Sequence, residues 1–396
     1  MAPKRALPPA RRATSDPSVA DDRQRMLRAL ELGASVRDRT SPNPWVGCVV
    51  VADRGGAGGG RGAGLEFEGA TSPPGGPHAE VVALRRAGEA ARGATAYVTL
   101  EPCVHHGRTP PCVDALLAAG VRRVVVAVVD PDPRVSGAGI DRLREDGVDV
   151  SVGACEDEGR ELLAPYLTHR STGRPFVVLK LAASLDGRIA APDGSSAWIT
   201  GDEARADAHR LRAESDAVLV GAGTVRCDDP RLTVRDAPGR SPRRIVLGAI
   251  PPGARVEPAT SMQGDLAAVL DELGAQDVVQ LLVEGGAAVS HDFHAAGLVD
   301  RYVLYIAPAL FGGDDALAMF AGPGTATMQQ LWRGRLVSVR ALGADLRVEL
   351  APVRADAHSP ERADAHSPER ADAHSASGRS PASGATAPET SPRESS

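Results

Sequence analysis

The sequence predicts an α/β protein with two folded domains. Short runs of Val, Ile, Leu and Ala alternate with helix-like stretches, and the alternation restarts near "THRSTGRP" at 168–175. The chain has 396 residues, which is longer than one ordinary hydrophobic core supports. We therefore expect two domains between two disordered ends. The expected ranges are a leader at 1–21, domains at 22–165 and 174–353, and a tail at 354–396.

The elements of the first domain follow from hydrophobic periodicity. The stretch "DDRQRMLRALELGASVR" from Asp22 has helical spacing, and "VGCVVVAD" at 46–53 predicts a buried strand. The glycine-rich run at 55–64 predicts a flexible loop. The next expected elements are a helix from about His78, the strand "TAYVTL", a helix from about Pro111 and the strand "RRVVVAVVD".

The second domain begins a new series of strands. Its expected strands are "FVVLKLAASLDGRIA", "AVLVGAGTV", "RRIVLGA", "VVQLLVEGG" and "RYVLYIAPAL", with helices at about 202–214 and 287–296. The tail repeats "RADAHSPE" at 354–361 and 362–369. A tail of this composition cannot bury enough apolar surface to fold, so we expect a solvated extension rather than a weak metal-binding segment.

Composition and charge exclude several classes of protein. A net charge of −6 and a pI near 6.0 argue against a general nucleic-acid binder. The basic, Pro-rich start has no apolar core of a signal peptide, and no stretch approaches 18 consecutive apolar residues, so we expect no membrane span. Five cysteines make a poor disulfide framework. We therefore expect a cytoplasmic protein in which clustered Cys and His bind metal.

One stretch, "HAEVVALRRAGEAARGATAYVTLEPCVHHGRTPPC" at 78–112, carries metal-binding side chains. His78, Cys103 and Cys112 would bind zinc and leave its fourth position for water. Zinc lowers the pKa of that water, while Glu80 would move protons without being a ligand. The alternative is an ordinary helix and strand with core thiols. Because H-x-E, then P-C after a strand, then a second Cys is the pattern of zinc deaminases, we expect a catalytic zinc site.

The same stretch resembles the deaminase domain of the RibD family, the bifunctional pyrimidine deaminase/reductases of riboflavin biosynthesis. Most cytidine and tRNA deaminases have C-x-x-C spacing, whereas "VHHGRTPP" separates the two cysteines here, as is characteristic of this family. The segments "SPNPWVGCVV" at 41–50 and "VDPDPRVSGAGIDRLREDGVDV" at 129–150 also look like its motifs. The resemblance covers nearly all of 22–352. It implies a cytidine-deaminase-like three-layer domain followed by a dihydrofolate-reductase-like domain.

The resemblance also assigns substrate contacts in the first domain. Asn43 would touch the pyrimidine, and His105 and Asp130 would line its pocket. A turn or cap role is the alternative for Asn43 and His105. The chain departs from the family at Asp132, where an asparagine is usual, so a carboxylate that only accepts hydrogen bonds replaces an amide that also donates them.

The second domain lacks the usual dinucleotide fingerprint, since "GAGTVR" has Arg226 where the last glycine should be. It instead resembles the reductase domain of the same family in "KLAASLDGRIA", "SSAWIT", "VGAGTVRCDDPRLTVR" and "LLVEGGAAVSHDF". The residues that would contact NADPH by this resemblance are Ala182, Trp198, Thr200, Thr224, Asp228, Gly286, Ala287, Ala288, Val289, Ser290, His291 and Asp292. Those that would hold the substrate are Lys180, Ser196, Arg212, Leu232, Arg235 and Glu284.

Physical arguments agree with this second site. A strand followed by a helix of small residues at about 287 leaves bare amide groups at a helix N-terminus, where a pyrophosphate can bind. Arg212 and Arg235 would grip a phosphate through charge-assisted bonds. A solvated helix face is the alternative for Arg212.

The resemblance implies an enzyme with two activities. The first is zinc-dependent hydrolytic deamination of 2,5-diamino-6-ribosylamino-4(3H)-pyrimidinone 5′-phosphate, and the second is NADPH-dependent reduction of its ribosyl group to ribityl. The expected partners are this phosphorylated small molecule and a second copy of the chain in a homodimer or higher homo-oligomer. A nucleoside or nucleic-acid deaminase with an accessory domain, and a non-catalytic scaffold, are the competing hypotheses.

Overall fold

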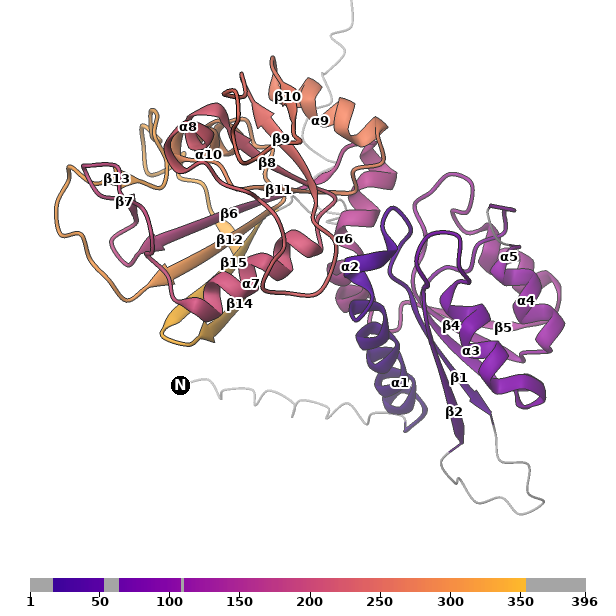
Figure 1. Ribbon diagram of the computed structural model, residues 1–396. Coiled ribbons are helices and arrows are strands. Elements are labelled where there is room, and N and C mark those ends of the chain that lie inside the picture. The colour runs from indigo at the N-terminus through magenta and orange to yellow at the C-terminus, as the bar shows by residue number, and fades with distance from the viewer. Residues whose placement is uncertain (1–16, 53–63, 108–109, 354–396) are drawn as a thin grey trace, which may run out of the picture. The chain divides into compact units, whose positions relative to one another are not determined.

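The computed structural model describes residues 17–52, 64–107 and 110–353 (Figure 1). The leader up to residue 16, the glycine-rich loop except Gly64 and the repeat tail lie outside the described residues. Two mixed sheets, each with its own helices, confirm the predicted α/β class. Among the described residues, no helix combines the length and apolar content that a membrane crossing requires.

The first sheet has five strands in the order β2-β1-β3-β4-β5. The strands are β1 (Gly47–Ala52), β2 (Leu65–Ala70), β3 (Thr95–Leu100), β4 (Arg123–Val128) and β5 (Asp149–Val152). β1 runs antiparallel to β2 and β3, whereas β3, β4 and β5 are parallel. The carboxyl ends of β3 and β4 therefore meet at one edge, and the segments that follow these two strands carry the chemistry of the first domain.

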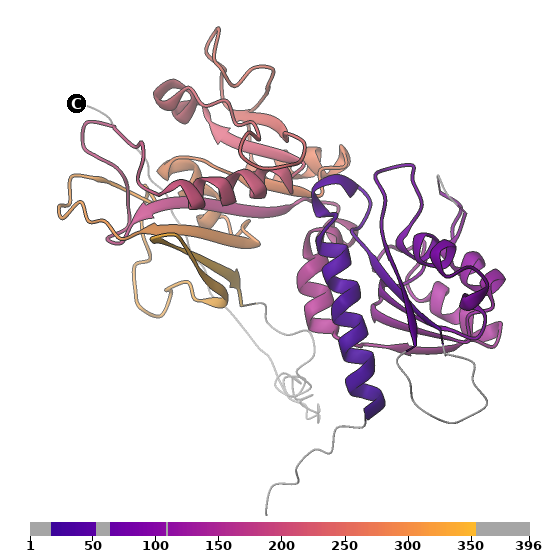
Figure 2. The ribbon, with the colours of Figure 1, turned by 60° about the horizontal axis from the view of Figure 1, so that its bottom comes forward.

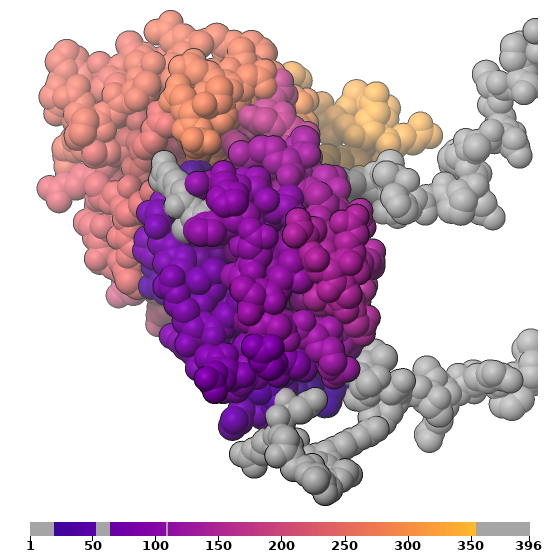
Figure 3. Space-filling model, turned by 90° about the vertical axis from the view of Figure 1, so that its right-hand side faces the viewer, coloured from indigo at the N-terminus to yellow at the C-terminus, as the bar shows by residue number. Residues whose placement is uncertain are grey.

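Helices cover both faces of this sheet. They are α1 (Pro17–Ala34), α2 (Arg37–Thr40), α3 (Ala79–Ala87), the 3-10 helix η1 (Gly88–Ala91), α4 (Cys112–Ala119), α5 (Ala138–Glu145) and α6 (Glu156–Thr172). α1 and α6 lie side by side on one face, and α3, α4 and α5 cover the other (Figures 1 and 2). Residues of this three-layer unit form the continuous indigo-to-magenta surface in Figure 3. Valines of β1, β3 and β4 are buried in its core, as the long apolar runs predicted.

The second sheet has eight strands in the order β10-β9-β8-β11-β6-β12-β15-β14. The strands are β6 (Phe176–Ser184), β8 (Ala217–Gly221), β9 (Arg243–Leu247), β10 (Thr260–Met262), β11 (Gln280–Val283), β12 (Arg301–Ala307), β14 (Gly334–Leu342) and β15 (Asp345–Pro352). Neighbours from β10 to β12 are parallel, and β12, β15 and β14 are antiparallel. A small sheet pairs β7 (Arg188–Ala190) with β13 (Leu317–Ala318), and the helices are α7 (Asp202–Ala213), α8 (Ala222–Asp228), α9 (Leu266–Ala275) and α10 (Ala287–Ala295).

Three elements differ from the expected boundaries. α1 already covers Pro17 to Asp21, before the expected start at Asp22. The expected strand at 217–225 ends at Gly221 and α8 follows. α6 continues through Thr172, beyond the expected domain end at 165. The hairpin of β14 and β15 was not predicted, because polar residues interrupt its apolar ones and most of its residues are at least partly exposed.

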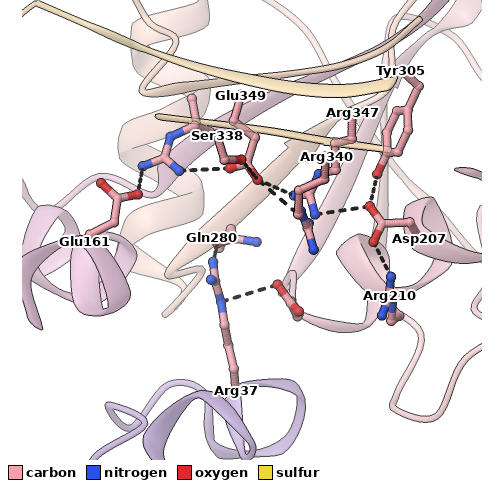
Figure 4. Close-up of polar contacts among 12 residues, drawn as sticks. Arg37, Glu161, Asp207, Arg210, Gln280, Tyr305, Ser338, Arg340, Arg347 and Glu349 are labelled. Atoms are coloured by element: carbon pink, nitrogen blue, oxygen red, sulfur yellow. Dashed lines mark hydrogen bonds and ion pairs between the residues drawn. The ribbon is translucent and has the colours of Figure 1, made fainter. Parts of the chain in front are cut away.

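An ion pair joins α6 to the second sheet, and a hydrogen bond joins α2 to it (Figure 4). Glu161 of α6 pairs with Arg301 of β12, which also donates to Glu349 at 3.1 Å. Arg37 of α2 donates to Oε1 of Gln280 at 2.6 Å. A neighbouring chain of contacts links Glu349, Arg347, Asp207 and Tyr305 across β15, α7 and β12. Arg301, Arg347, Asp207 and Glu349 are largely buried, and each has an oppositely charged partner, as burial requires.

The packing of α1 on β1 leads to a stability prediction. A Cβ at Gly47 would lie 1.8 Å from the carbonyl oxygen of Ala29, and backbone atoms cannot move aside as a flexible side chain can. We expect Gly47→Ala to lower the free energy of unfolding by about 3 kcal/mol or more, measured by urea denaturation. Gly324→Ala is the control, because its Cβ meets no heavy atom within 4 Å. Equal stability of the two variants would contradict this packing.

Candidate functional site

Three ligand-type side chains meet where β3 ends and two helices begin. His78 is the N-cap residue of α3, Cys103 follows β3 by three residues, and Cys112 is the first residue of α4. The backbone N–H of Val113 donates to the carbonyl of Cys103, which ties the strand exit to the start of α4. The nine-residue separation of the cysteines is thereby closed into one corner of the domain.

The distances within this cluster fit one zinc ion. Nδ1 of His78 lies 3.2 Å from Sγ of Cys112 and 3.7 Å from Sγ of Cys103. The three ligand atoms all lie within 4.8 Å of one another. Tetrahedral zinc with ordinary Zn–N and Zn–S bonds would separate such a nitrogen and sulfur by about 3.5 Å. The predicted ligands are therefore close enough to share a single ion.

Thiolate formation in this corner is favoured at Cys103. Its pKa is lowered to about 4, first because the Cys112 thiol donates to it and further because His78 and the backbone N–H of Cys112 do so. The same hydrogen bond, together with burial, raises the pKa of Cys112. Zinc binds thiolates rather than thiols, so Cys103 has the form that a metal needs, whereas Cys112 would have to give up its proton when a metal binds.

Glu80 lies in the first turn of α3, beside the cluster but outside its ligand set. Its side chain is buried, with a residue exposure of 4%. Burial raises the pKa of this carboxyl, and the neighbouring charge of Cys103 raises it further. A carboxyl with a raised pKa next to a metal-ligand cluster is suited to carry a proton.

A second buried carboxylate, Glu101, was quoted in the sequence pattern but given no role. Its two oxygens accept four backbone N–H groups, from Asp130 at 3.2 Å, Gly137 at 3.0 Å, Gly139 at 2.9 Å and Ile140 at 3.3 Å. The last two open α5, where the helix dipole also favours an anion. Glu101 thus connects the residues after β3 to the segment after β4. Its position two residues before Cys103 is the feature of the sequence that could have indicated a role for it.

A cavity of about 310 Å³ is lined by His78 and Cys103, two of the three predicted metal ligands. Asn43, His105 and Asp130 line it together with His78 and Glu80, so the structure brings these five predicted residues to one site. Within the described residues, Nδ1 of His105 is buried and has no hydrogen-bond partner. A buried nitrogen without a partner at a cavity wall is a natural contact point for a polar ligand.

The far wall of this cavity is charged. Asp130 accepts a hydrogen bond from the Tyr166 hydroxyl at 3.0 Å, and burial raises its pKa. Asp132, the departure from the family pattern, is held by Arg134 through Nε at 2.9 Å and Nη2 at 2.6 Å. This pairing outweighs burial and holds the pKa of Asp132 at about 2. Arg134 therefore neutralises the charge that Asp132 places at the wall. Arg170 lies beside them in the lining.

The second domain has its own charged cavity, of about 480 Å³. At its base, the Glu284 carboxylate accepts hydrogen bonds from Nε of Arg212 at 2.5 Å and from Nη2 at 2.9 Å. It also forms an ion pair with Nζ of Lys180 at 3.5 Å. The Arg212 side chain is only 14% exposed, so the alternative of a solvated helix face is wrong. Burial opposes ionisation of Glu284, but Arg212 and Lys180 outweigh it and bring its pKa to about 2.

Most of the predicted substrate and cofactor residues share this second cavity. The lining includes Lys180, Ala182, Ser196, Trp198, Thr200, Arg212, Asp228, Arg235 and Glu284. Trp198 is 75% exposed, and the guanidinium of Arg205 lies 4.7 Å from the centre of its ring. An exposed indole at a cavity wall offers an apolar face on which a flat ring can stack. Arg205, His209 and Asp236 also line the cavity and were not predicted.

The remaining predicted residues lie behind or beside the cavity wall. Leu232 is buried in the core and is not part of the lining. Oγ1 of Thr224 accepts a hydrogen bond from the backbone N–H of Gly286 at 3.2 Å. In the predicted turn 286–292, Ala287 and Ser290 are buried. Gly285 lines the cavity just before the N-terminus of α10, and a Cβ there would lie 2.5 Å from Cβ of Val289.

Sequence comparisons divide the chain at the same place as the two sheets. Residues 20–128 match the family described as cytidine and deoxycytidylate deaminase zinc-binding region, and residues 175–348 match the RibD C-terminal domain. The chain is 41% identical to riboflavin biosynthesis protein RibD of Aquifex aeolicus over 82% of its length and 97% of that protein. It is 40% identical to the Escherichia coli protein of the same name, with 83% and 99% covered.

Solved structures agree with this division. A structure titled Acinetobacter baumannii RibD, form 1, is 40% identical with a TM-score of 0.77, and the match covers 85% of this chain and all of that one (100%). A Thermotoga maritima diaminohydroxyphosphoribosylaminopyrimidine deaminase/5-amino-6-(5-phosphoribosylamino)uracil reductase is 35% identical with a TM-score of 0.75, covering 85% and 99%. Both matches span the two sheets.

The Glu284 ion pairs predict a pH dependence of stability. A carboxyl whose folded pKa is about 2, below its ordinary 4.5, stabilises the fold above pH 4.5 and loses this contribution as pH falls towards 2. We expect Glu284→Gln to cost about 3 kcal/mol at pH 7, and the gap to the wild type to shrink between about pH 5 and pH 3. Urea denaturation across this range measures the gap. A gap that stays constant would contradict ionised pairing.

Proposed function

Since this chain belongs to the RibD family, and is an enzyme with a zinc-binding deaminase domain and a reductase domain, we propose that its two sites act in succession on one phosphorylated pyrimidine. The first removes the 2-amino group of 2,5-diamino-6-ribosylamino-4(3H)-pyrimidinone 5′-phosphate, and the second reduces the ribosyl group to ribityl. This proposal rests chiefly on the cluster of His78, Cys103 and Cys112, because His78 and Cys103 line one cavity together with Glu80. We assign the deaminase to residues 22–165 and the reductase to 174–353.

In the deaminase, the three ligand residues would hold zinc, which supplies Lewis acidity and an activated water when bound. Glu80 takes a proton from the attacking water and delivers it to the departing ammonia. Asn43 and His105 hold the pyrimidine, and the unpartnered Nδ1 of His105 supports this role. Asp130 closes the pocket from the end of β4, where Tyr166 fixes its orientation.

In the reductase, NADPH supplies the hydride when bound. Lys180, Arg212 and Glu284 form one ion cluster at the base of the cavity that orients the substrate, and Arg235 faces its phosphate from the rim. Ser196 and the region around Leu232 complete the substrate side. The proposed cofactor side consists of Ala182, Trp198, Thr200, Thr224, Asp228 and the turn from Gly286 to Asp292.

Two further assignments concern assembly and location. We assign a homodimer or higher homo-oligomer, because among the described residues β14 is an edge strand that pairs only with β15, and Leu336, Val339 and Leu346 of the β14–β15 hairpin are exposed. We assign the cytoplasm, because reducing conditions keep Cys103 and Cys112 available as metal ligands. A nucleic-acid deaminase with an accessory domain is disfavoured, since the family relationship spans both domains.

The deaminase proposal is tested by zinc content together with ammonia release, for the wild type and Glu80→Gln. We expect about one zinc per chain in both proteins. Ammonia release from the diaminopyrimidine substrate should fall at least 100-fold in the variant, because the proton carrier is lost while the ligands remain. His78→Ala is the control that should lose the metal. A wild type that binds zinc without releasing ammonia would refute this substrate, and loss of zinc in Glu80→Gln would refute the non-ligand role.

The Asp132–Arg134 pair leads to a separate prediction. Arg134→Ala leaves a carboxylate without its partner at the cavity wall, so we expect the deaminase KM to rise about tenfold. In an Asp132→Asn background the same change should raise KM less than twofold, because no charge remains to be neutralised. Arg144→Ala, on the exposed face of α5, is the control. An equal rise in both backgrounds would mean that Arg134 acts on the substrate directly.

A further inference from the structure

We propose that His209 is a positioning residue of the reductase, which fixes the loop at 230–236 so that Arg235 faces the substrate cavity. This inference rests on the role proposed above for Arg235. His209 lies on α7, has a residue exposure of 5% and lines the cavity together with Arg235 and Asp236. It has no part in the ion cluster of Glu284, so its role must come from its own contacts.

Both nitrogens of the His209 ring face this loop. The backbone N–H of Arg235 donates to Nδ1 at 3.3 Å, which makes Nδ1 an acceptor. The proton of the neutral ring is therefore on Nε2, which lies 3.2 Å from Oδ2 of Asp236 and donates to it. One imidazole thus holds two consecutive loop residues, one through the backbone and one through the side chain.

The surroundings of the ring favour this neutral form. Burial lowers the pKa of His209, and the positive charges of Arg212 and Arg235 lower it further. Asp236 and Glu284 act in the opposite direction and are outweighed. A neutral imidazole is required here, because a protonated ring would present a donor at Nδ1 to the donor N–H of Arg235.

The loop has few other anchors. It contains no helix or strand, and Leu232 fixes its start by burial in the core. The carbonyl of Thr233 accepts a hydrogen bond from Nη1 of Arg212 at 3.3 Å, and the backbone N–H of Val234 donates one to Oγ of Ser241 at 3.0 Å. His209 and Arg212 lie three residues apart on one face of α7. Arg212 holds the middle of the loop, so its exposed end depends on His209.

Removing a positioning histidine and removing an ordinary buried histidine should change different kinetic constants. If His209 acts through Arg235, its removal weakens binding of the phosphorylated substrate and leaves the cofactor side unaffected. The signature is a raised KM for the pyrimidine with an unchanged KM for NADPH, since the lost interaction serves ground state and transition state alike. A general weakening of the fold would change both constants and kcat together.

The test uses steady-state reduction by the full-length protein, followed through NADPH consumption with the phosphoribosylaminouracil substrate. We expect His209→Ala to raise the KM for the pyrimidine about tenfold and the KM for NADPH less than twofold. His209→Asn should restore most of the loss, because its amide oxygen lies near the position of Nδ1 and can accept the Arg235 N–H. Arg210→Ala is the control on the same helix, since that side chain pairs with Asp207 and does not line the cavity.

A double-variant cycle decides whether the effect passes through Arg235. In an Arg235→Ala background, His209→Ala should add less than a twofold change in KM. An equal loss in both backgrounds, or failure of His209→Asn to restore KM, overturns the inference. A raised KM in Arg235→Ala with an unchanged KM in His209→Ala also overturns it, while the proposed role of Arg235 stands. An unchanged KM in Arg235→Ala overturns both.

Discussion

A buried carboxylate must find donors within the protein, and this requirement organises both cavities. Glu101 is surrounded by four backbone N–H groups and Glu284 by an arginine and a lysine. Each joins segments that are distant in sequence, because no single element supplies enough donors. In the first domain this connection fixes the exit of β3 beside Cys103. In the second it ties α7 and β6 to the end of β11.

The parallel parts of the two sheets explain where these carboxylates lie. Cys103 and Asp130 follow neighbouring strands β3 and β4, and in the second sheet Glu284 follows β11, beside Gly221 at the end of β8. Parallel strands place their carboxyl ends at one edge, where connecting loops form a crevice. The predicted metal ligands of the first domain and the charged base of the second cavity therefore lie at equivalent places, at the carboxyl ends of parallel strands, with different side chains.

Local pattern predicted much of this arrangement. Long apolar runs predicted the central strands β1, β3, β4 and β6, because strands buried on both faces need apolar side chains throughout. The same reasoning failed for β14 and β15, because these partly exposed strands at the edge of the sheet have no long apolar run. The metal ligands were predictable because zinc chemistry restricts residue type, order and position relative to strands and helices. His209 was not, since a histidine on a helix says nothing about the loop that it will meet.

The sequence by itself determined the two α/β domains and the three ligand-type side chains with their neighbouring acid, because these depend on periodicity and on residue types that few other roles require. The residues of the second cavity were expected only from the resemblance to the RibD family. Only the tertiary structure decided which groups compensate the buried carboxylates: Arg212 and Lys180 for Glu284, and the backbone of α5 for Glu101. Spacing along the chain does not fix these pairings, because charge compensation depends on distance in space and on the exclusion of water.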